Sequence, residues 1–407
     1  MNLNKLKDET IGFGVAESFY LLFWILKPFY LRGSGTLQIA DVMLAFAFLS
    51  LVMARRKIQI YREDKPLFIF VGFTTLINTI YFLITQEISF LLSVSYYIYN
   101  IMGVYAARYF LVVENSRKRL LHILEFGLVL QFLLYCLGIG VYEGRRYIGT
   151  FNDPNQFGFF VLSSFFIIFV ISYLNGYKQS FLIVALVLFL ILQSASMGML
   201  SSFLIFILCY ISFKLLSPNA TKTKRVLGLF LLVLGIGIAI VMILNFEVIL
   251  SYLNDSNILY LKRISNKIGL LFGKTAGNYS SIQEDRNWQL LSLYPEYMII
   301  GAGQGFYERF TKLRIIHEVH STWLGILFSY GLTPTIFFAN WVYRCIKTLP
   351  RDLWCVYIAF FFEALLLVNQ RQPAFWTLLT LASIVRSCLR HSSENYRLNG
   401  DITSLKE

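Results

Sequence analysis

The stretch RRYIGTFNDPNQFGFFVLSSFFIIFVISYL, residues 145–174, joins a polar segment to an apolar one. Residues 156–174 carry no charge, and a run of about 20 apolar residues is long enough to cross a bilayer as a helix. The residues before them hold two arginines, two asparagines, an aspartate and a proline. The stretch therefore predicts a membrane helix that begins at a polar loop on the membrane surface.

The same apolar pattern recurs along the whole chain. Hydrophobic residues make up 57% of the 407 positions and charged residues only 14%, whereas soluble domains have about 25% charged residues. We therefore expect an all-α, polytopic integral membrane protein. About twelve transmembrane helices are predicted, near residues 11–31, 36–54, 66–85, 88–113, 120–141, 156–174, 180–196, 198–216, 225–246, 318–343, 352–369 and 372–389. Between the seventh and eighth segments, QSASMGML could be a tight turn or a break within one helix.

Lysine and arginine occur in every second loop between these segments. By the positive-inside rule, those loops and both termini are cytoplasmic. The predicted organisation is nine helices over 1–246, one large extracytoplasmic loop with short helices over 247–317, three helices over 318–390, and a cytoplasmic tail over 391–407. The unusual polar segments then all lie on the outer face, where we expect the function.

Several classes of function are disfavoured. The net charge of +13 reflects topology signals rather than a nucleic-acid site, since no such motif is present. The five cysteines are scattered without a CxxC pair, so we interpret them as packing residues. The sequence GAGQG follows no strand of a βαβ unit, and HEVH lacks the HExxH spacing of a zinc protease. We expect no cofactor, no metal and no nucleic acid.

Arginines are the most informative residues of the predicted outer face. Arginine binds phosphate bidentately and keeps its charge, and charged side chains near lipid are costly, so several on one face suggest an anionic ligand. Each alone could simply contact lipid headgroups. Asn155 is expected to cap the helix beginning near Gln156 and to expose backbone N–H groups to an anion. The candidate arginines are Arg145, Arg146, Arg286, Arg309, Arg314 and Arg371.

Five segments follow one another in a recognisable order: RYIGTFNDPNQFGFFVL, LQSASMGMLSSF, DRNWQLL, YPEYMIIGAGQGF and HSTWLGILFSYGL. Together they resemble the bacterial O-antigen polymerase and ligase superfamily of membrane glycosyltransferases, over about residues 145–332. Two positions depart from the family pattern. Met197 stands where a basic residue is common, and Ser321 stands where asparagine is common.

The resemblance implies an enzyme that transfers an oligosaccharide from undecaprenyl pyrophosphate to a sugar hydroxyl on the outer face of a bacterial inner membrane. It suggests His320 as the base and Arg286 as a catalytic cation, with His317, Glu284 and Asp285 as competitors for the base. Substrate-binding residues would be Arg145, Arg146, Asn155, Gly303, Arg309, Arg314 and Arg371. A chain-length regulator is a possible partner by analogy.

Three functions stay open at this point. The first is a polymerase that extends a lipid-linked O-antigen or capsular polysaccharide. The second is a ligase that transfers the glycan to a lipid A core. The third is a lipid-linked oligosaccharide transporter, which would place charges near the membrane midplane. Possible midplane charges are Glu17, Asp41, Glu125 and Glu363.

Overall fold

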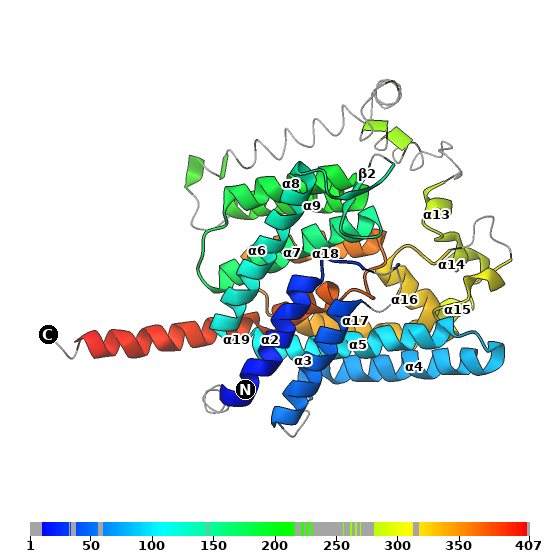
Figure 1. The fold of residues 1–407 in the computed structure, drawn as a ribbon, viewed down its shortest axis with the longest axis horizontal. Coiled ribbons are helices and arrows are strands. Elements are labelled where there is room, and N and C mark those ends of the chain that lie inside the picture. Colours follow the sequence, from blue (N-terminus) through cyan, green and yellow to red (C-terminus); the bar gives the residue numbers. More distant parts are fainter. Residues whose placement is uncertain are drawn as a thin grey trace.

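The computed structural model describes residues 10–31, 33, 38–55, 60–144, 146–215, 281–311 and 317–404, with isolated residues between 221 and 269. These parts of the chain are mostly helical (Figure 1). The predicted span over 225–246 and the first half of the predicted large loop lie outside the described residues. The number of about twelve spans therefore stays a prediction.

Each predicted apolar segment within the described ranges overlaps a helix, with ends that differ by at most six residues except where noted below. The largest shift is at α6, which begins at Glu114 rather than at residue 120, so the basic residues 117–119 of the predicted loop lie within the helix. Among the described residues, five helical segments are long and apolar enough to cross a membrane: α4 with the turn before it, α5, α6, α7 and α9. The bounds are α2 (Thr10–Leu26), α3 (Ile39–Arg55), α4 (Lys65–Thr85), α5 (Ser89–Phe110), α6 (Glu114–Cys136), α7 (Pro154–Leu174), α8 (Phe181–Ser194), α9 (Met197–Leu215), α16 (Thr322–Tyr330), α17 (Leu332–Ile346), α18 (Trp354–Leu366) and α19 (Pro373–Ser404).

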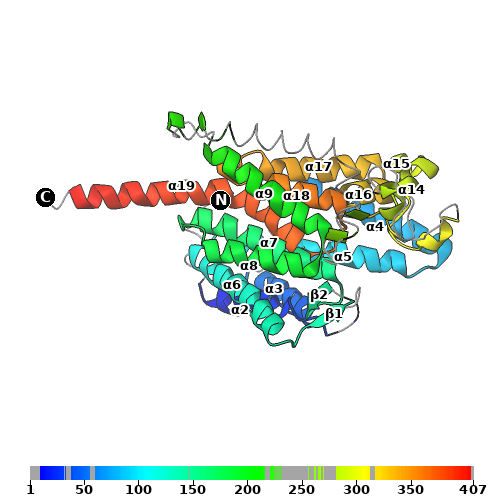
Figure 2. The same cartoon turned by 90° about the horizontal axis from the view of Figure 1, so that it is seen from above.

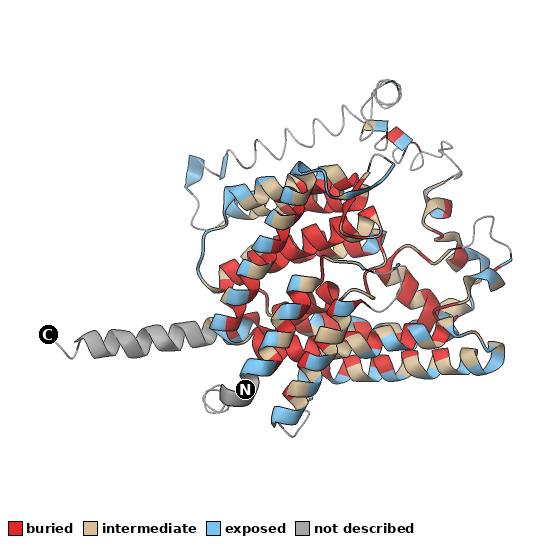
Figure 3. Ribbon diagram, viewed as in Figure 1, coloured by how far each residue is buried: buried red, intermediate tan, exposed pale blue. Residues whose placement is uncertain are grey.

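Helix α7 is the centre of the bundle. Its apolar window is 94% buried, and α6, α8, α9, α18 and α19 all pack against it. Figure 3 shows most of α7 in the colour of buried residues. A helix enclosed on every side needs no polar face, which explains why residues 156–174 carry no charge.

The connection between α8 and α9 is a tight turn, one of the two predicted alternatives. Ala195 adopts φ 47° and ends α8. Lys178, just before α8, and Lys214, at the end of α9, line one cavity at the other end of these helices. The chain therefore runs along α8 and returns along α9.

Three features differ from the prediction. The predicted span 318–343 is divided at Gly331, whose φ of 78° is outside the helical region and where a Cβ would clash with the Ile299 carbonyl. Helix α19 continues to Ser404, so part of the predicted tail 391–407 is helical, and it projects from the bundle (Figure 1). A short antiparallel hairpin, β1 (Val141–Glu143) with β2 (Arg146–Gly149), precedes α7.

The second half of the predicted loop contains short helices, as expected. They are α13 (Ile282–Asp285), α14 (Gln289–Leu293), α15 (Tyr297–Ile300) and η2 (Tyr307–Arg309). Figure 2 shows that α14, α15, β1 and β2 lie toward the same end of the bundle, away from the projecting end of α19. We call this the polar end.

Candidate functional site at the polar end of the bundle

Residues 286–288, which form the turn before α14, are hydrogen-bonded to residues 317–320. The second segment contains the two neighbouring histidines, His317 and His320. The His320 N–H donates to the Arg286 carbonyl at 2.9 Å, and the Trp288 Nε1 donates to the His320 carbonyl at 3.3 Å. The Asn287 amide donates to the His317 carbonyl. Asn287 is fully buried with φ 57°, a conformation that asparagine tolerates better than most residues. Three hydrogen bonds thus fix Arg286 beside His320.

Arg286 also contacts the end of α18. Its Nη1 donates to the Leu366 carbonyl at 2.8 Å, and its Nε lies 3.3 Å from the Asp285 carboxylate. A cation at a helix C-terminus interacts favourably with the carbonyls that end there. The Leu367 carbonyl, next along the chain, accepts from both the N–H and the hydroxyl of Thr322 at 2.9 Å. This ties the starts of α14 and α16 to the end of α18.

The environment of His320 favours its neutral form. The pKa of His320 is lowered from its ordinary 6.5 to about 4, mainly by burial and also by His317 and Arg286, against the opposite effect of Glu318 and Asp285. The rings of His317 and His320 meet edge to face with centroids 4.8 Å apart. His320 is therefore uncharged at neutral pH and able to accept a proton.

Arg371 lies in the loop between α18 and α19. Its Nη2 is 2.5 Å from Oε2 of Glu318, and its guanidinium lies over the Tyr96 ring with 5.6 Å between Cζ and the centroid. When the Gln304 amide is oriented to satisfy all its neighbours, its oxygen also accepts from Arg371 at 2.9 and 3.2 Å. Burial lowers the pKa of Arg371, but Glu318 and the neighbouring tyrosines together outweigh burial and raise the pKa above its ordinary value. Arg371 therefore stays charged. Its partner Glu318 lies two positions before His320 in the chain, so the ion pair is held next to the histidine.

Arg146 and Asn155 meet the turn between α8 and α9. The Arg146 Nε donates to the Ser194 carbonyl at 3.1 Å and its Nη2 donates to Oδ1 of Asn155 at 3.3 Å. The Ser196 hydroxyl donates to the same Oδ1 at 3.0 Å. Arg146 thus brings a basic group to this turn from another part of the chain.

The predicted cap of α7 was wrong. Asp153, not Asn155, caps the helix, since its carboxylate accepts from the N–H groups of Asn155 and Gln156 at 2.7 and 3.1 Å. Pro154 occupies the first helical position, where its fixed φ and missing N–H are tolerated. Asn155 therefore lies inside the first turn of α7, and its side-chain oxygen accepts hydrogen bonds from Arg146 and Ser196.

The two groups of residues are joined through one contact region. A Cβ at Gly198, two residues after Ser196, would lie 3.3 Å from the Leu367 side chain, and Leu367 follows the residue whose carbonyl binds Arg286. Gly158 on α7 likewise approaches Ser194 and Ser196 closely. The polar end therefore brings together Arg146, Asn155, Arg286, His320 and Arg371.

The glycine-rich segment 301–305 has a packing role. Its N–H groups donate within the protein, that of Gly303 to the Ser329 carbonyl at 2.7 Å and that of Gln304 to Asn78 at 2.9 Å. A Cβ at Gly303 would lie 2.7 Å from the Tyr81 ring. Only glycine allows so close an approach at φ 68°. Because these N–H groups are occupied, the segment does not form a phosphate cradle.

Arg309 braces this same segment. Its Nη2 donates to the carbonyls of Ala302 and Gly303, and its guanidinium lies about 5 Å from the centroids of the Tyr81, Phe90 and Phe310 rings. Burial lowers the pKa of Arg309. In this structure Gly303 and Arg309 contact other parts of the protein, and we do not include them among the substrate-binding residues proposed below.

Arg145 and Arg314 lie outside the described residues, so their predicted roles stay predictions. Sequence reasoning overlooked two residues of the site, Glu318 and Gln304, which hold Arg371. Glu318 lies in the sequence between the two candidate histidines, and this position could have marked it as a residue of the site. Within the described parts of the chain, no three histidine, cysteine or acidic side chains are grouped to hold a metal ion.

Comparison with family models, with curated proteins and with solved structures gives no match for this chain.

Proposed function

We propose that the chain is a membrane glycosyltransferase that polymerises oligosaccharide repeat units carried on undecaprenyl pyrophosphate. The observation that supports this most is the convergence at one end of the bundle. Arg286 binds the carbonyl end of α18, His320 is hydrogen-bonded to Arg286, and Arg371 lies in the loop that follows α18. Arg146 and Asn155 contact the α8–α9 turn, and α9 packs against α18. A donor with a pyrophosphate group needs several cations and one base at a membrane surface.

Arg286 and Arg146 would stabilise the departing pyrophosphate. In the transfer, the bond between the anomeric carbon and the pyrophosphate oxygen breaks, and undecaprenyl pyrophosphate leaves with the electron pair. A fixed cation at that oxygen lowers the barrier by roughly 3 kcal/mol. The Arg286 guanidinium is held by the Leu366 carbonyl and the Asp285 carboxylate, so little reorganisation is needed during the reaction. Arg371 has more partners within the protein than Arg286 has. It would orient the donor indirectly, by holding Glu318 and the histidines on either side of it.

His320 would take the proton from the attacking hydroxyl. Its pKa of about 4 keeps it unprotonated over the whole neutral range, which is one requirement of a general base. A pyrophosphate bound beside it would raise that pKa by electrostatic attraction and strengthen the base. The hydroxyl oxygen then forms the new glycosidic bond, so that one bond is made as one is broken.

The polar end would face outward from a bacterial inner membrane, with both chain termini in the cytoplasm. The donor lipid and the surrounding bilayer are the expected partners, together with a chain-length regulator. A transporter is less favoured, because two of the four residues proposed as midplane charges are paired near helix ends. Asp41, near the start of α3, accepts from Tyr99 at 2.6 Å, and Glu363, in the last turn of α18, accepts from Asn369.

The test is polymerisation by the purified protein. Incubated with undecaprenyl-pyrophosphate-linked repeat units alone, it should give a ladder of products on a gel. His320→Ala should slow the ladder by about 10²–10⁴-fold, and Arg286→Ala by about 10²–10³-fold. His317→Ala is the matched control for the histidine, and Arg344→Ala, on α17, is the control for the arginine; both should retain most of the activity.

Other outcomes separate the alternatives. Transfer that appears only when a lipid A core is added would make the protein a ligase with the same donor chemistry. Absence of transfer to either acceptor by a well-folded preparation would reject both enzymes and leave the transporter. A full ladder from both His320→Ala and Arg286→Ala would refute the assigned roles.

A further inference from the structure

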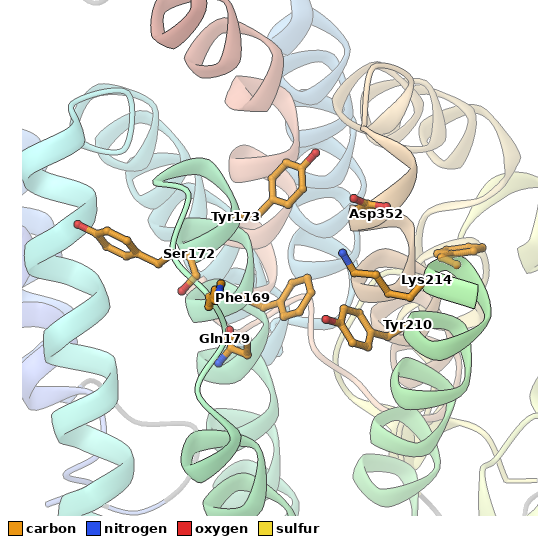
Figure 4. Close-up of a pocket in the computed structure, with 10 residues that line it drawn as sticks. Phe169, Ser172, Tyr173, Gln179, Tyr210, Lys214 and Asp352 are labelled. Atoms are coloured by element: carbon orange, nitrogen blue, oxygen red, sulfur yellow. The ribbon is translucent and has the colours of Figure 1, made fainter. Parts of the chain in front are cut away.

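A cavity lies at the end of the bundle opposite the polar end. It has a volume of about 380 Å³ and is lined by the C-terminal ends of α7 and α9, the residues before α8, and the turn η3 (Arg351–Leu353). Figure 4 shows Lys214 and Tyr210 on α9 facing Phe169 on α7, with Asp352 nearby. The segments that line it belong to three loops predicted to be cytoplasmic. None of its residues takes part in the site at the polar end.

The lining combines cations, a carboxylate and aromatic rings. Lys178 and Lys214 are exposed, and Asp352 is half-buried. Aromatic walls come from Phe169, Phe213 and three tyrosines, and the Lys214 Nζ lies 5.8 Å from the Tyr210 ring centroid. Lysines suit a phosphate, whereas a carboxylate among aromatic rings suits an ammonium group. The cavity therefore offers complementary partners to a ligand that carries both charges.

The surface beside the cavity is apolar. Phe181 and Leu182, at the start of α8, are 80% and 76% exposed, and Leu208 on α9 is 66% exposed. These side chains are within a few residues of the lining residues Gln179 and Tyr210. Exposed apolar side chains on membrane helices contact acyl chains, and basic pockets between helices on the cytoplasmic side bind lipid headgroups. A ligand with two tails and a charged head matches this arrangement.

We propose that this cavity is a binding site for a zwitterionic phospholipid headgroup, a phosphodiester that carries an ammonium group. Lys178 and Lys214 bind the phosphate, Asp352 binds the ammonium, and the acyl chains lie along the exposed faces of α8 and α9. The site is independent of the function proposed for the polar end.

The test is lipid retention by the full-length protein in native mass spectrometry. The detergent-purified chain is mixed with equal amounts of dioleoyl phosphatidylethanolamine and dioleoyl phosphatidylglycerol. Phosphatidylethanolamine should be retained several-fold over phosphatidylglycerol. The double variant Lys178→Ala with Lys214→Ala should lower retention of phosphatidylethanolamine by roughly tenfold or more, since each lysine near a membrane surface contributes about 1 kcal/mol.

Two further variants make the test specific. Lys65→Ala with Lys347→Ala removes two exposed lysines outside the cavity and should leave retention unchanged. Asp352→Asn should reduce the preference for phosphatidylethanolamine and leave phosphatidylglycerol equal or stronger. Equal retention by the cavity and control double variants would overturn the proposal. So would displacement of the lipid by millimolar O-phosphoethanolamine, which would make a free phosphate ester the ligand.

Discussion

Among the arginine–carboxylate pairs of the described residues, Arg108–Asp64 and Arg371–Glu318 differ most clearly in what surrounds them. Arg108, at the end of α5, binds Asp64 through Nε and Nη2 at 2.5 and 2.6 Å, and the Trp341 Nε1 donates to the same carboxylate at 2.9 Å. Both side chains are at most 7% exposed. Arg371 binds Glu318 through Nη2 at 2.5 Å and Nη1 at 3.4 Å, and these side chains are 32% and 25% exposed.

The difference separates a structural clamp from a candidate site. The Arg108–Asp64 pair is bidentate and enclosed, and it joins α4, α5 and α17, so it has no surface to offer a ligand. The Arg371–Glu318 pair lies beside His317 and His320 at the polar end, where part of each side chain is accessible. A buried arginine in a membrane protein is therefore not by itself evidence of a functional site. The exposure of the arginine–carboxylate pair distinguishes a structural pair from a candidate site.

The largest effect that tests this comparison is expected for Asp64→Asn. The variant leaves the Arg108 charge buried without its carboxylate, which costs about 3–5 kcal/mol of unfolding free energy in comparable pairs. The measurement is thermal unfolding of the purified protein in detergent. Glu63→Gln, at the exposed neighbouring position, is the matched control. A midpoint for Asp64→Asn equal to that of the control would show that the clamp contributes nothing.

Glu318→Gln is expected to have a smaller effect. The amide can still accept from Arg371, and the pair is partly exposed, so we expect a loss of about 1–2 kcal/mol, between the values for exposed and buried pairs. The same unfolding assay measures it, with Glu308→Gln on the exposed side of η2 as the control. A loss as large as that of Asp64→Asn would mean that the two pairs are energetically alike and would remove the distinction between them.

The helices could be predicted from the sequence because the length of an apolar run is a strong local signal. The polar end followed from the alternation of basic loops, which is also local. The role of Gly303 depends on Tyr81 and Phe90, and the pairing of Arg371 depends on Glu318. Such distant contacts have no trace in one sequence. The cap of α7 could have been read correctly, because Pro154 favours the first helical position and so makes Asp153 the cap.

The pH dependence of stability that comes from His320 is expected to lie between the effects of Asp64→Asn and Glu318→Gln, and it is a test of the histidine beside the exposed pair. Its pKa is about 4 in the folded protein and about 6.5 when unfolded, so between these values the unfolded state binds more protons and stability falls as pH falls. Above pH 7 both states are neutral and the contribution vanishes. The unfolding midpoint of the wild type should therefore fall by roughly 1–4 °C relative to His320→Gln between pH 7 and pH 4. His122→Gln, which removes an imidazole that is 73% exposed, is the control. A midpoint that rises for the wild type relative to His320→Gln on acidification would mean that the folded protein prefers a charged His320, and the histidine would then resemble the paired Arg371 rather than a base.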